Sequence, residues 1–159
     1  MPLTITDEVL EQFRRTWDEF RDIVRKMPDE AWGTGPLDYL VPARLAYHIL
    51  RFANMYASNE HYTVYNAAPQ YQLQGEFEAP LVDLPTREQV LANISQTEAT
   101  VKQWLLGLGD GGLAQPEDKY PWTASMPIGR AMYGLRHIMW HVGELNALLR
   151  IRGYGQGQW

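Results

Sequence analysis

An all-α fold, with four long helices packed as a four-helix bundle, is predicted for this chain on three observations. Four segments carry apolar residues at steps of three and four, which places those residues on one side of a helix. No segment alternates polar and apolar residues with a period of two, so no strand is predicted. The length of 159 residues suits one domain with its own core, so residues 1–159 are expected to form a single domain.

The first helix is predicted over residues 7–27. Thr6 is of a type that caps helix N-termini, and Asp7 and Glu8 follow it, where the helix dipole favours negative charge. Pro28 ends the segment because proline cannot continue a helix, and "PDEAW" is expected to form a short extra turn. The apolar side of this helix consists of Val9, Leu10, Phe13, Trp17, Phe20, Val24 and Met27.

The second helix is predicted to begin near Pro42, because proline suits the first helical position, and to run to about residue 60. Residues 66–85 follow with three prolines, one glycine and no helical period. A connection of that length is usually functional or a crossover, and it can run the length of the bundle, so the second and third helices can be parallel. The inward side of the second helix consists of Leu45, His48, Ile49, Phe52, Met55 and Tyr56.

The third helix is predicted to begin at "TREQ", residues 86–89, which has the form of a capping box, and to stop at "GDGG", residues 109–112. Its apolar side consists of Val90, Leu91, Ile94, Val101, Trp104, Leu105 and Leu108. The fourth helix is predicted from Pro127 to Gly153, since glycine commonly follows the last helical turn. Its apolar side consists of Ala131, Leu135, Ile138, Val142, Leu145 and Leu149.

Composition narrows the function classes. The net charge of −5 argues against nucleic acid as a partner, because phosphate binding requires a basic patch. The chain has no cysteine, so it has no disulfide, no thiolate ligand and no cysteine nucleophile. The first residues lack the basic and apolar regions of a signal peptide, and no run of about 18 apolar residues occurs. We therefore expect a cytoplasmic protein that does not bind membranes.

His137 and His141 stand four apart in the fourth predicted helix, so their side chains face the same way. Two imidazoles placed in this way can bind one metal ion, as in the helix signature of zinc proteases. That signature also needs a glutamate next to the first histidine, and this chain has "HIMWH", which argues against a protease. The alternative is that both are partly exposed helix residues with ordinary hydrogen bonds.

His48 supplies a third candidate ligand, on the inward side of the second helix. A buried imidazole without a partner costs free energy, which a metal ion or a hydrogen bond to another helix removes. One histidine from the second helix and two from the fourth would form a three-nitrogen site with open coordination positions. The alternative is a core histidine bonded to a carbonyl or carboxylate. His61, about 20 Å further along a continuous helix, is expected at the surface.

Two neighbours are candidate catalytic residues. Tyr133 precedes His137 by one turn and can donate to a substrate oxygen, while Glu144 follows His141 by three residues and can orient it or take a proton. The alternatives are packing for Tyr133, and a solvated charge or an ion pair for Glu144. A divalent ion on three neutral imidazoles would lower the pKa of bound water to about 7, or hold a thiol as thiolate. With no cysteine in the chain, that thiol would be a small molecule.

The stretches "ARLAYHILRF" and "RHIMWHVGELNALLRIRG", with "MPDEAW" after the first helix, resemble the DinB/YfiT-like superfamily of metalloenzymes over about residues 7–153. The resemblance implies an up-down-down-up bundle with a long crossover between helices two and three. It implies a divalent metal, most often zinc or nickel, held by His48, His137 and His141. It also implies a homodimer, which the aromatic residues Tyr62, Tyr65, Tyr71 and Phe77 favour as well.

Characterised members of this superfamily include transferases and isomerases that use mycothiol, bacillithiol or glutathione. The resemblance therefore implies a metal-dependent transferase, isomerase or hydrolase that acts on a small-molecule substrate. A different reading is a non-catalytic bundle that binds a metal or a protein partner in a stress response. In a third reading no metal binds, and the histidines are structural.

Overall fold

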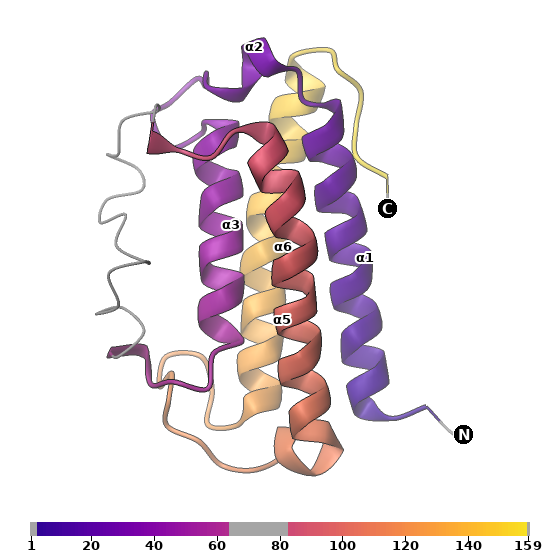
Figure 1. Ribbon diagram of the computed structural model, residues 1–159, viewed down its shortest axis with the longest axis vertical. Helices are drawn as coiled ribbons and strands as arrows, with labels where there is room; N and C mark the ends of the chain where they lie inside the picture. Colours follow the sequence, from indigo (N-terminus) through magenta and orange to yellow (C-terminus); the bar gives the residue numbers. More distant parts are fainter. Residues whose placement is uncertain (1–2, 64–82, 159) are drawn as a thin grey trace.

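The computed structural model describes residues 3–63 and 83–158, and within these ranges the chain forms helices and no strand, which confirms the predicted all-α class (Figure 1). The short helix α2, Asp29–Trp32, is the extra turn predicted for "PDEAW". The described helices are α1 (Ile5–Lys26), α2 (Asp29–Trp32), α3 (Pro42–Tyr56), α5 (Arg87–Leu113) and α6 (Pro127–Ile151). None of them is long and apolar enough to cross a lipid bilayer.

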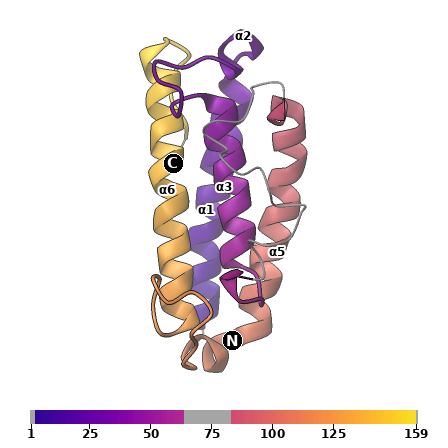
Figure 2. The same ribbon diagram turned by 90° about the vertical axis from the view of Figure 1, so that its left-hand side faces the viewer.

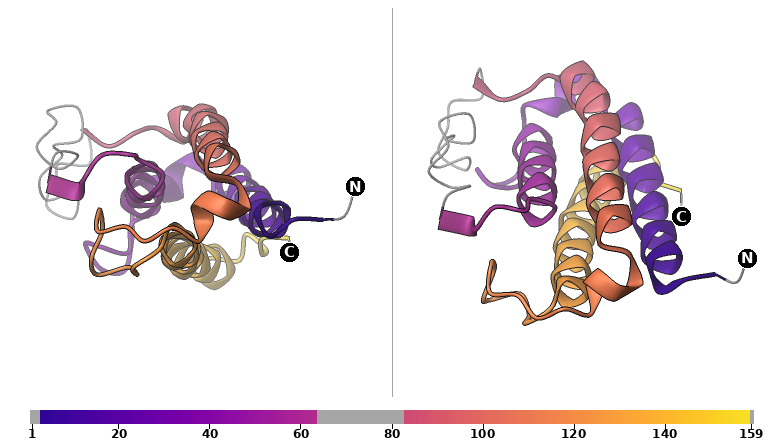
Figure 3. Two further views of the ribbon diagram at one scale, coloured as in Figure 1. Left: turned by 90° about the horizontal axis from the view of Figure 1, so that it is seen from below. Right: turned by 60° about the horizontal axis from the view of Figure 1, so that its bottom comes forward.

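The four long helices lie side by side. In Figure 1, α1 and α6 run from the bottom to the top of the view, and α3 and α5 run from top to bottom. Figure 2 shows α3 between α5 and α6, and the end view in Figure 3 places α1 across the molecule from α3. Accordingly, α1 and α3 each pack against both α5 and α6. The two helices that carry the candidate metal ligands, α3 and α6, are therefore direct neighbours.

The core lies between these helices and is formed by the apolar sides predicted from the sequence. Each fully buried side chain of this size stabilises the fold by about 1.5–3 kcal/mol relative to an exposed position. Leu10, Leu91, Leu108 and Leu135 are only partly buried and pack at the edge of the core. Among the fully buried side chains are Phe20, Val24, Leu45, Ile49, Val90, Ile94, Leu105, Val142, Leu145 and Leu149.

The prediction that Thr6 caps the first helix is wrong: α1 begins at Ile5, and Thr4 is its N-cap. The Thr4 hydroxyl accepts a hydrogen bond from the backbone N–H of Asp7 at 3.1 Å, and the Asp7 carboxylate accepts one from the N–H of Thr4 at 3.0 Å. This reciprocal pair is a capping box. The hydroxyl of Thr6 instead donates to the carboxylate of Asp110, 2.7 Å away.

Helix α3 ends at Tyr56, earlier than the predicted residue 60. The hydroxyl of Tyr120 donates to the carbonyl of Met55 at 2.7 Å, and the guanidinium of Arg130 donates to the carbonyl of Ser58 at 2.8 Å. These side chains donate to carbonyl oxygens that would accept backbone hydrogen bonds if the helix continued. The predicted crossover, residues 66–85, lies mostly outside the described residues, and Tyr65, Tyr71 and Phe77 lie wholly outside them.

Helix α5 starts with the predicted capping box, in which Thr86 accepts from the N–H of Gln89 and the Gln89 side chain accepts from the N–H of Thr86. The "GDGG" segment kinks the helix instead of ending it. Gly109 has φ 57° and ψ −178°, and helical structure resumes as far as Leu113. After this kink, the Asp110 carboxylate accepts hydrogen bonds from the backbone N–H groups of Ile5 and Thr6 at the start of α1.

We expect the substitution Gly109→Ala to lower the free energy of unfolding by about 1–3 kcal/mol, because the backbone conformation of Gly109 is one that only glycine adopts readily. Gly111→Ala is the matched control, since a side chain there meets no atom within 4 Å and the φ angle is not positive. Urea denaturation of the two variants measures the difference. Equal free energies of unfolding in the two variants would contradict the backbone conformation described for Gly109.

Helix α6 ends as predicted. Gly153 has φ 78°, its N–H donates to the carbonyl of Arg150, and the N–H of Tyr154 donates to the carbonyl of Leu149. This is the Schellman pattern that glycine permits after a helix. Beyond it the chain turns back along α1 and α6, where the N–H of Gly157 donates to the side-chain carbonyl of Asn146 at 2.9 Å.

Candidate metal site

Three histidines converge where α3 packs against α6. His48 lies in the middle of α3, while His137 and His141 lie one turn apart on α6 and so face the same side. One ring nitrogen of each lies within 4.8 Å of those of the other two, and in the described part of the chain these three residues form a group able to hold a metal ion. The structure thus brings together the three histidines that the sequence analysis named as candidate ligands.

The ring nitrogens are close to the spacing that one ion requires. The Nε2 atoms of His48 and His137 are 2.8 Å apart, and the ring centroid of His141 lies 4.5 Å from that of His48 and 4.9 Å from that of His137. With zinc–nitrogen bonds of about 2.0–2.1 Å, two nitrogens on one ion are at most about 4.2 Å apart. The Nε2 atoms of His48 and His137 lie within this limit, and the ligand nitrogens of the whole group lie within 4.8 Å of one another, a bound slightly above it.

The protonation state of His137 suits a ligand. Burial, together with the neighbouring His48 and His141, lowers the pKa of His137 to about 4. A histidine with this pKa is uncharged at neutral pH, so its lone pair is available. The contact between the two Nε2 atoms is a hydrogen bond only when one ring carries its proton on Nε2. With both protons on Nδ1, two lone pairs point at the same position, which favours a cation there.

Glu144 orients the third ring. The Nδ1 atom of His141 lies 2.7 Å from one carboxylate oxygen of Glu144, and the indole N–H of Trp140 donates to the other at 3.2 Å. When Nδ1 donates to the carboxylate, the lone pair of the ring is on Nε2, as in the carboxylate–histidine–metal arrangement of many metalloproteins. This geometry fits the first of the two roles predicted for Glu144, which is to orient the ring of His141.

Aromatic side chains form one wall of the site. The ring of Phe52 stacks on that of His137 with centroids 5.0 Å apart, and it lies 4.4 Å from the ring of His48. Tyr56 meets His137 edge-on at 5.8 Å. The sequence placed Phe52 and Tyr56 in the core. Their position beside the histidines follows from their spacing of four and eight residues after His48, which puts them on the same side of α3.

The other wall is partly open. The side chain of His141 is 17% exposed and that of Glu144 28%, whereas His48 is buried at 6%. The α6 side of the histidine cluster is therefore more exposed to solvent than the α3 side.

Tyr133 lies in the same aromatic region, with its ring 6.4 Å from that of His137 and 5.4 Å from that of Tyr56. The guanidinium of Arg136 lies over the Tyr133 ring at 5.0 Å. Through these contacts the Tyr133 ring packs in the aromatic region beside His137. His61 is not a member of the histidine cluster, and its Nδ1 atom lies 2.8 Å from the hydroxyl of Thr63.

We expect Glu144→Ala to lower the affinity for Zn²⁺ about 10- to 100-fold, the usual effect of removing a carboxylate that orients a histidine ligand. Glu98→Ala is the matched control, because that side chain is similarly exposed but pairs with Arg21, away from the histidines. Competition titration against a fluorescent zinc chelator measures both affinities. An unchanged affinity in Glu144→Ala would show that the carboxylate does not support the ligand.

Comparisons of the chain with protein-family profiles, with curated proteins and with solved structures gave no match.

Proposed function

We propose that this protein is a metal-dependent enzyme of the DinB/YfiT-like type, an up-down-down-up four-helix bundle that acts on a small-molecule substrate. The observation that carries the proposal is the convergence of His48, His137 and His141, with their ligand atoms within 4.8 Å of one another. The helix directions in Figure 1 and the neighbouring positions of α3 and α6 support the bundle order.

The three histidines would hold a divalent ion, with zinc or nickel the best candidates, because uncharged imidazoles suit both metals. Three protein nitrogens and a partly exposed side are typical of catalytic zinc sites and differ from the closed four-ligand set of structural sites. When bound, such an ion would supply Lewis acidity and favour the deprotonated form of a water or thiol beside it.

The chain's own side chains would position the reactants. Glu144 holds the ring of His141 through Nδ1, so it is a positioning residue for the metal site. The aromatic rings of Phe52 and Tyr56 keep water from the α3 side of the cluster. Burial raises the pKa of the Tyr56 hydroxyl, so that it stays protonated. Tyr133, one turn from His137, is the candidate donor to a substrate oxygen.

Thiol-dependent transfer or isomerisation is the preferred reaction class, and hydrolysis is the second. Since the chain has no cysteine, any thiol would be a low-molecular-weight cosubstrate such as mycothiol, bacillithiol or glutathione. The partly exposed His141 and Glu144 leave a route by which such a molecule can reach the cluster.

A cobalt-substituted protein tests this proposal. Adding glutathione, or a simple thiol such as 2-mercaptoethanol, should produce an intense thiolate-to-cobalt charge-transfer band in the near ultraviolet. The corresponding disulfide should produce none, and His141→Ala protein should respond weakly or not at all. A spectrum that responds to azide but not to any thiol would support hydrolysis. A spectrum unchanged by every added ligand would contradict the enzyme proposal.

A non-catalytic metal-binding bundle is the second candidate. The observation in its favour is the tight packing of Phe52 against two of the three imidazoles, together with the burial of His48. A closed site of this kind would give a cobalt spectrum that no added ligand changes, so the same titration distinguishes the two candidates.

We further propose that the protein is a cytoplasmic homodimer with a small-molecule substrate and no nucleic-acid partner. The net charge of −5 supports the last point. Light scattering at micromolar concentration should give twice the chain mass of 18.3 kDa, and a monomer mass would contradict the dimer.

A further inference from the structure

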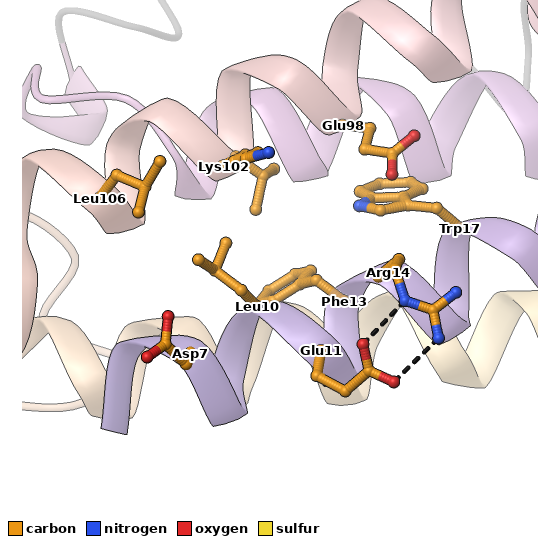
Figure 4. Close-up of a pocket in the computed structure, with 10 residues that line it drawn as sticks. Asp7, Leu10, Glu11, Phe13, Arg14, Trp17, Glu98, Lys102 and Leu106 are labelled. Atoms are coloured by element: carbon orange, nitrogen blue, oxygen red, sulfur yellow. Dashed lines mark hydrogen bonds and ion pairs between the residues drawn. The ribbon is translucent and has the colours of Figure 1, made fainter. Parts of the chain in front are cut away.

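A second candidate site lies between α1 and α5, away from the histidines. A hollow of about 390 Å³ opens there (Figure 4). That volume falls in the range of small-molecule sites and is too small for a protein domain. A larger groove between α3 and α5 is lined mainly by polar side chains and does not include the histidines either. The apolar lining of the α1–α5 hollow consists of Leu10, Phe13, Trp17, Val101 and Leu106.

Trp17 leaves a hydrogen-bond donor unused in this hollow. Its side chain is 1% exposed, yet its indole N–H donates to no acceptor in the structure. In Figure 4 the indole nitrogen faces the space between Leu10 and Lys102. A buried donor without a partner costs free energy, so an acceptor supplied by a ligand at this position would be stabilising.

Three carboxylates and two cations line the hollow, and each carboxylate has a partner of its own. Asp7 accepts hydrogen bonds from the backbone N–H and the hydroxyl of Thr4. Glu11 is bound by Arg14 and Arg15, and Glu98 is bound by Arg21 at 2.7 Å. Lys102 is exposed and forms no ion pair or hydrogen bond with the residues that the structure describes. Among the lining residues, the one buried side-chain polar atom without a hydrogen-bond partner is therefore a donor, the indole N–H of Trp17, and Lys102 adds a positive charge near it.

We propose that this hollow binds a small apolar carboxylate, with an aromatic or branched aliphatic body. The body would pack against Leu10, Phe13 and Leu106, and a carboxylate oxygen would accept the hydrogen bond from Trp17. Lys102, at the rim, favours the negative charge. The proposal rests on α1 and α5 alone, so it is independent of the function proposed for the histidine site.

Phenylacetate is a suitable probe, and the indole N–H signals in a ¹⁵N–¹H correlation spectrum report its binding. The signal of Trp17 is the one that disappears in Trp17→Phe, and it should shift saturably as phenylacetate is added. Isothermal titration calorimetry should show that Trp17→Phe binds phenylacetate at least about tenfold more weakly, because the variant cannot donate a hydrogen bond to the charged carboxylate. Lys102→Met should also weaken binding, and phenethylamine, a cation without an acceptor, should not bind.

Trp104→Phe is the matched control. The indole N–H of Trp104 is also buried without an acceptor, but this residue does not line the hollow. Its replacement should leave phenylacetate affinity unchanged. If Trp17→Phe does not fold, Leu10→Phe serves instead: the larger ring fills the space, so the Trp17 signal should persist but no longer shift.

Three outcomes would overturn the proposal. The first is the absence of any saturable shift of the Trp17 signal at millimolar phenylacetate. The second is equal affinity in Trp17→Phe and Trp104→Phe. The third is a Trp17 signal that shifts with protein concentration alone while the molar mass doubles, because a second copy of the chain would then cover the hollow.

Discussion

Replacing Arg130 with leucine is expected to lower the free energy of unfolding by about 3–5 kcal/mol, the usual effect of removing one partner of a buried ion pair. Arg130 is 1% exposed, and its Nε atom lies 2.9 Å from a carboxylate oxygen of Glu117, whose side chain is 10% exposed. Without the guanidinium, this carboxylate would remain buried without its cation, which is costly.

The guanidinium of Arg130 also joins three parts of the chain. It donates to the carbonyl of Ser58 just after α3, and it lies 4.7 Å from the ring of Trp104 on α5 and 4.9 Å from that of Tyr120. Burial lowers the pKa of Arg130, but an arginine remains charged under all ordinary conditions. The substitution would therefore loosen the loop segments after α3 and before α6 together.

Arg15→Leu is the control for this prediction. Arg15 forms an ion pair with Glu11 at 2.9 Å, but its side chain is 66% exposed, and such surface pairs contribute at most about 1 kcal/mol. Guanidinium chloride denaturation of both variants gives the comparison. A loss in Arg130→Leu no larger than that in Arg15→Leu would show that the buried ion pair does not hold this end of the molecule together.

His48→Ala is expected to reduce the bound metal from about one divalent ion per chain to almost none. Removing a direct ligand should weaken metal affinity by more than the roughly 100-fold upper effect of removing an orienting residue. His48 is the one candidate ligand from α3, so without it the remaining histidines are the pair on α6. Elemental analysis of the purified proteins measures the metal content directly.

The control for this prediction is His61→Ala, which removes a histidine outside the cluster. It should retain the metal content of the unmodified protein, and His141→Ala should lose it. Equal metal content in all these variants would mean that the three histidines do not hold an ion, and the proposed function would fail with it.

The helices were predictable because their apolar residues repeat at helical spacing over long segments. Local signals also worked where the partners are close in sequence, as in the capping box of Thr86 and Gln89 and the helix end at Gly153. At the start of α1 the local signals predicted the wrong N-cap, because Thr4 and Thr6 are the same residue type. There, Asp110 binds Thr6 from more than 100 residues away, and this contact cannot be read from local sequence.

The end of α3 was missed for a similar reason. Tyr120 and Arg130 take the carbonyls of Met55 and Ser58, and both come from distant parts of the chain. The near-complete burial of Arg130 was also not predicted, although it stands two turns before Ile138 and so on the inward side of α6. A charged residue at such a position is a signal that a buried partner exists.

The candidate site was predictable at the level of residue choice. The spacing of His137 and His141 and the inward position of His48 pointed to all three residues. Their convergence could not be derived from spacing, because it depends on the height at which α3 and α6 cross. The contact of Glu144 with His141 follows from helical spacing, whereas the stacking of Phe52 on a histidine of another helix depends on packing.

A crystal structure of the metal-loaded protein, with anomalous difference maps recorded on both sides of the absorption edge of the metal, is the most direct test of the central claim. We expect one peak per chain, about 2.0–2.1 Å from a ring nitrogen of each of His48, His137 and His141. The absence of a peak at this position, or a peak that only one or two of the three rings reach, would contradict the account.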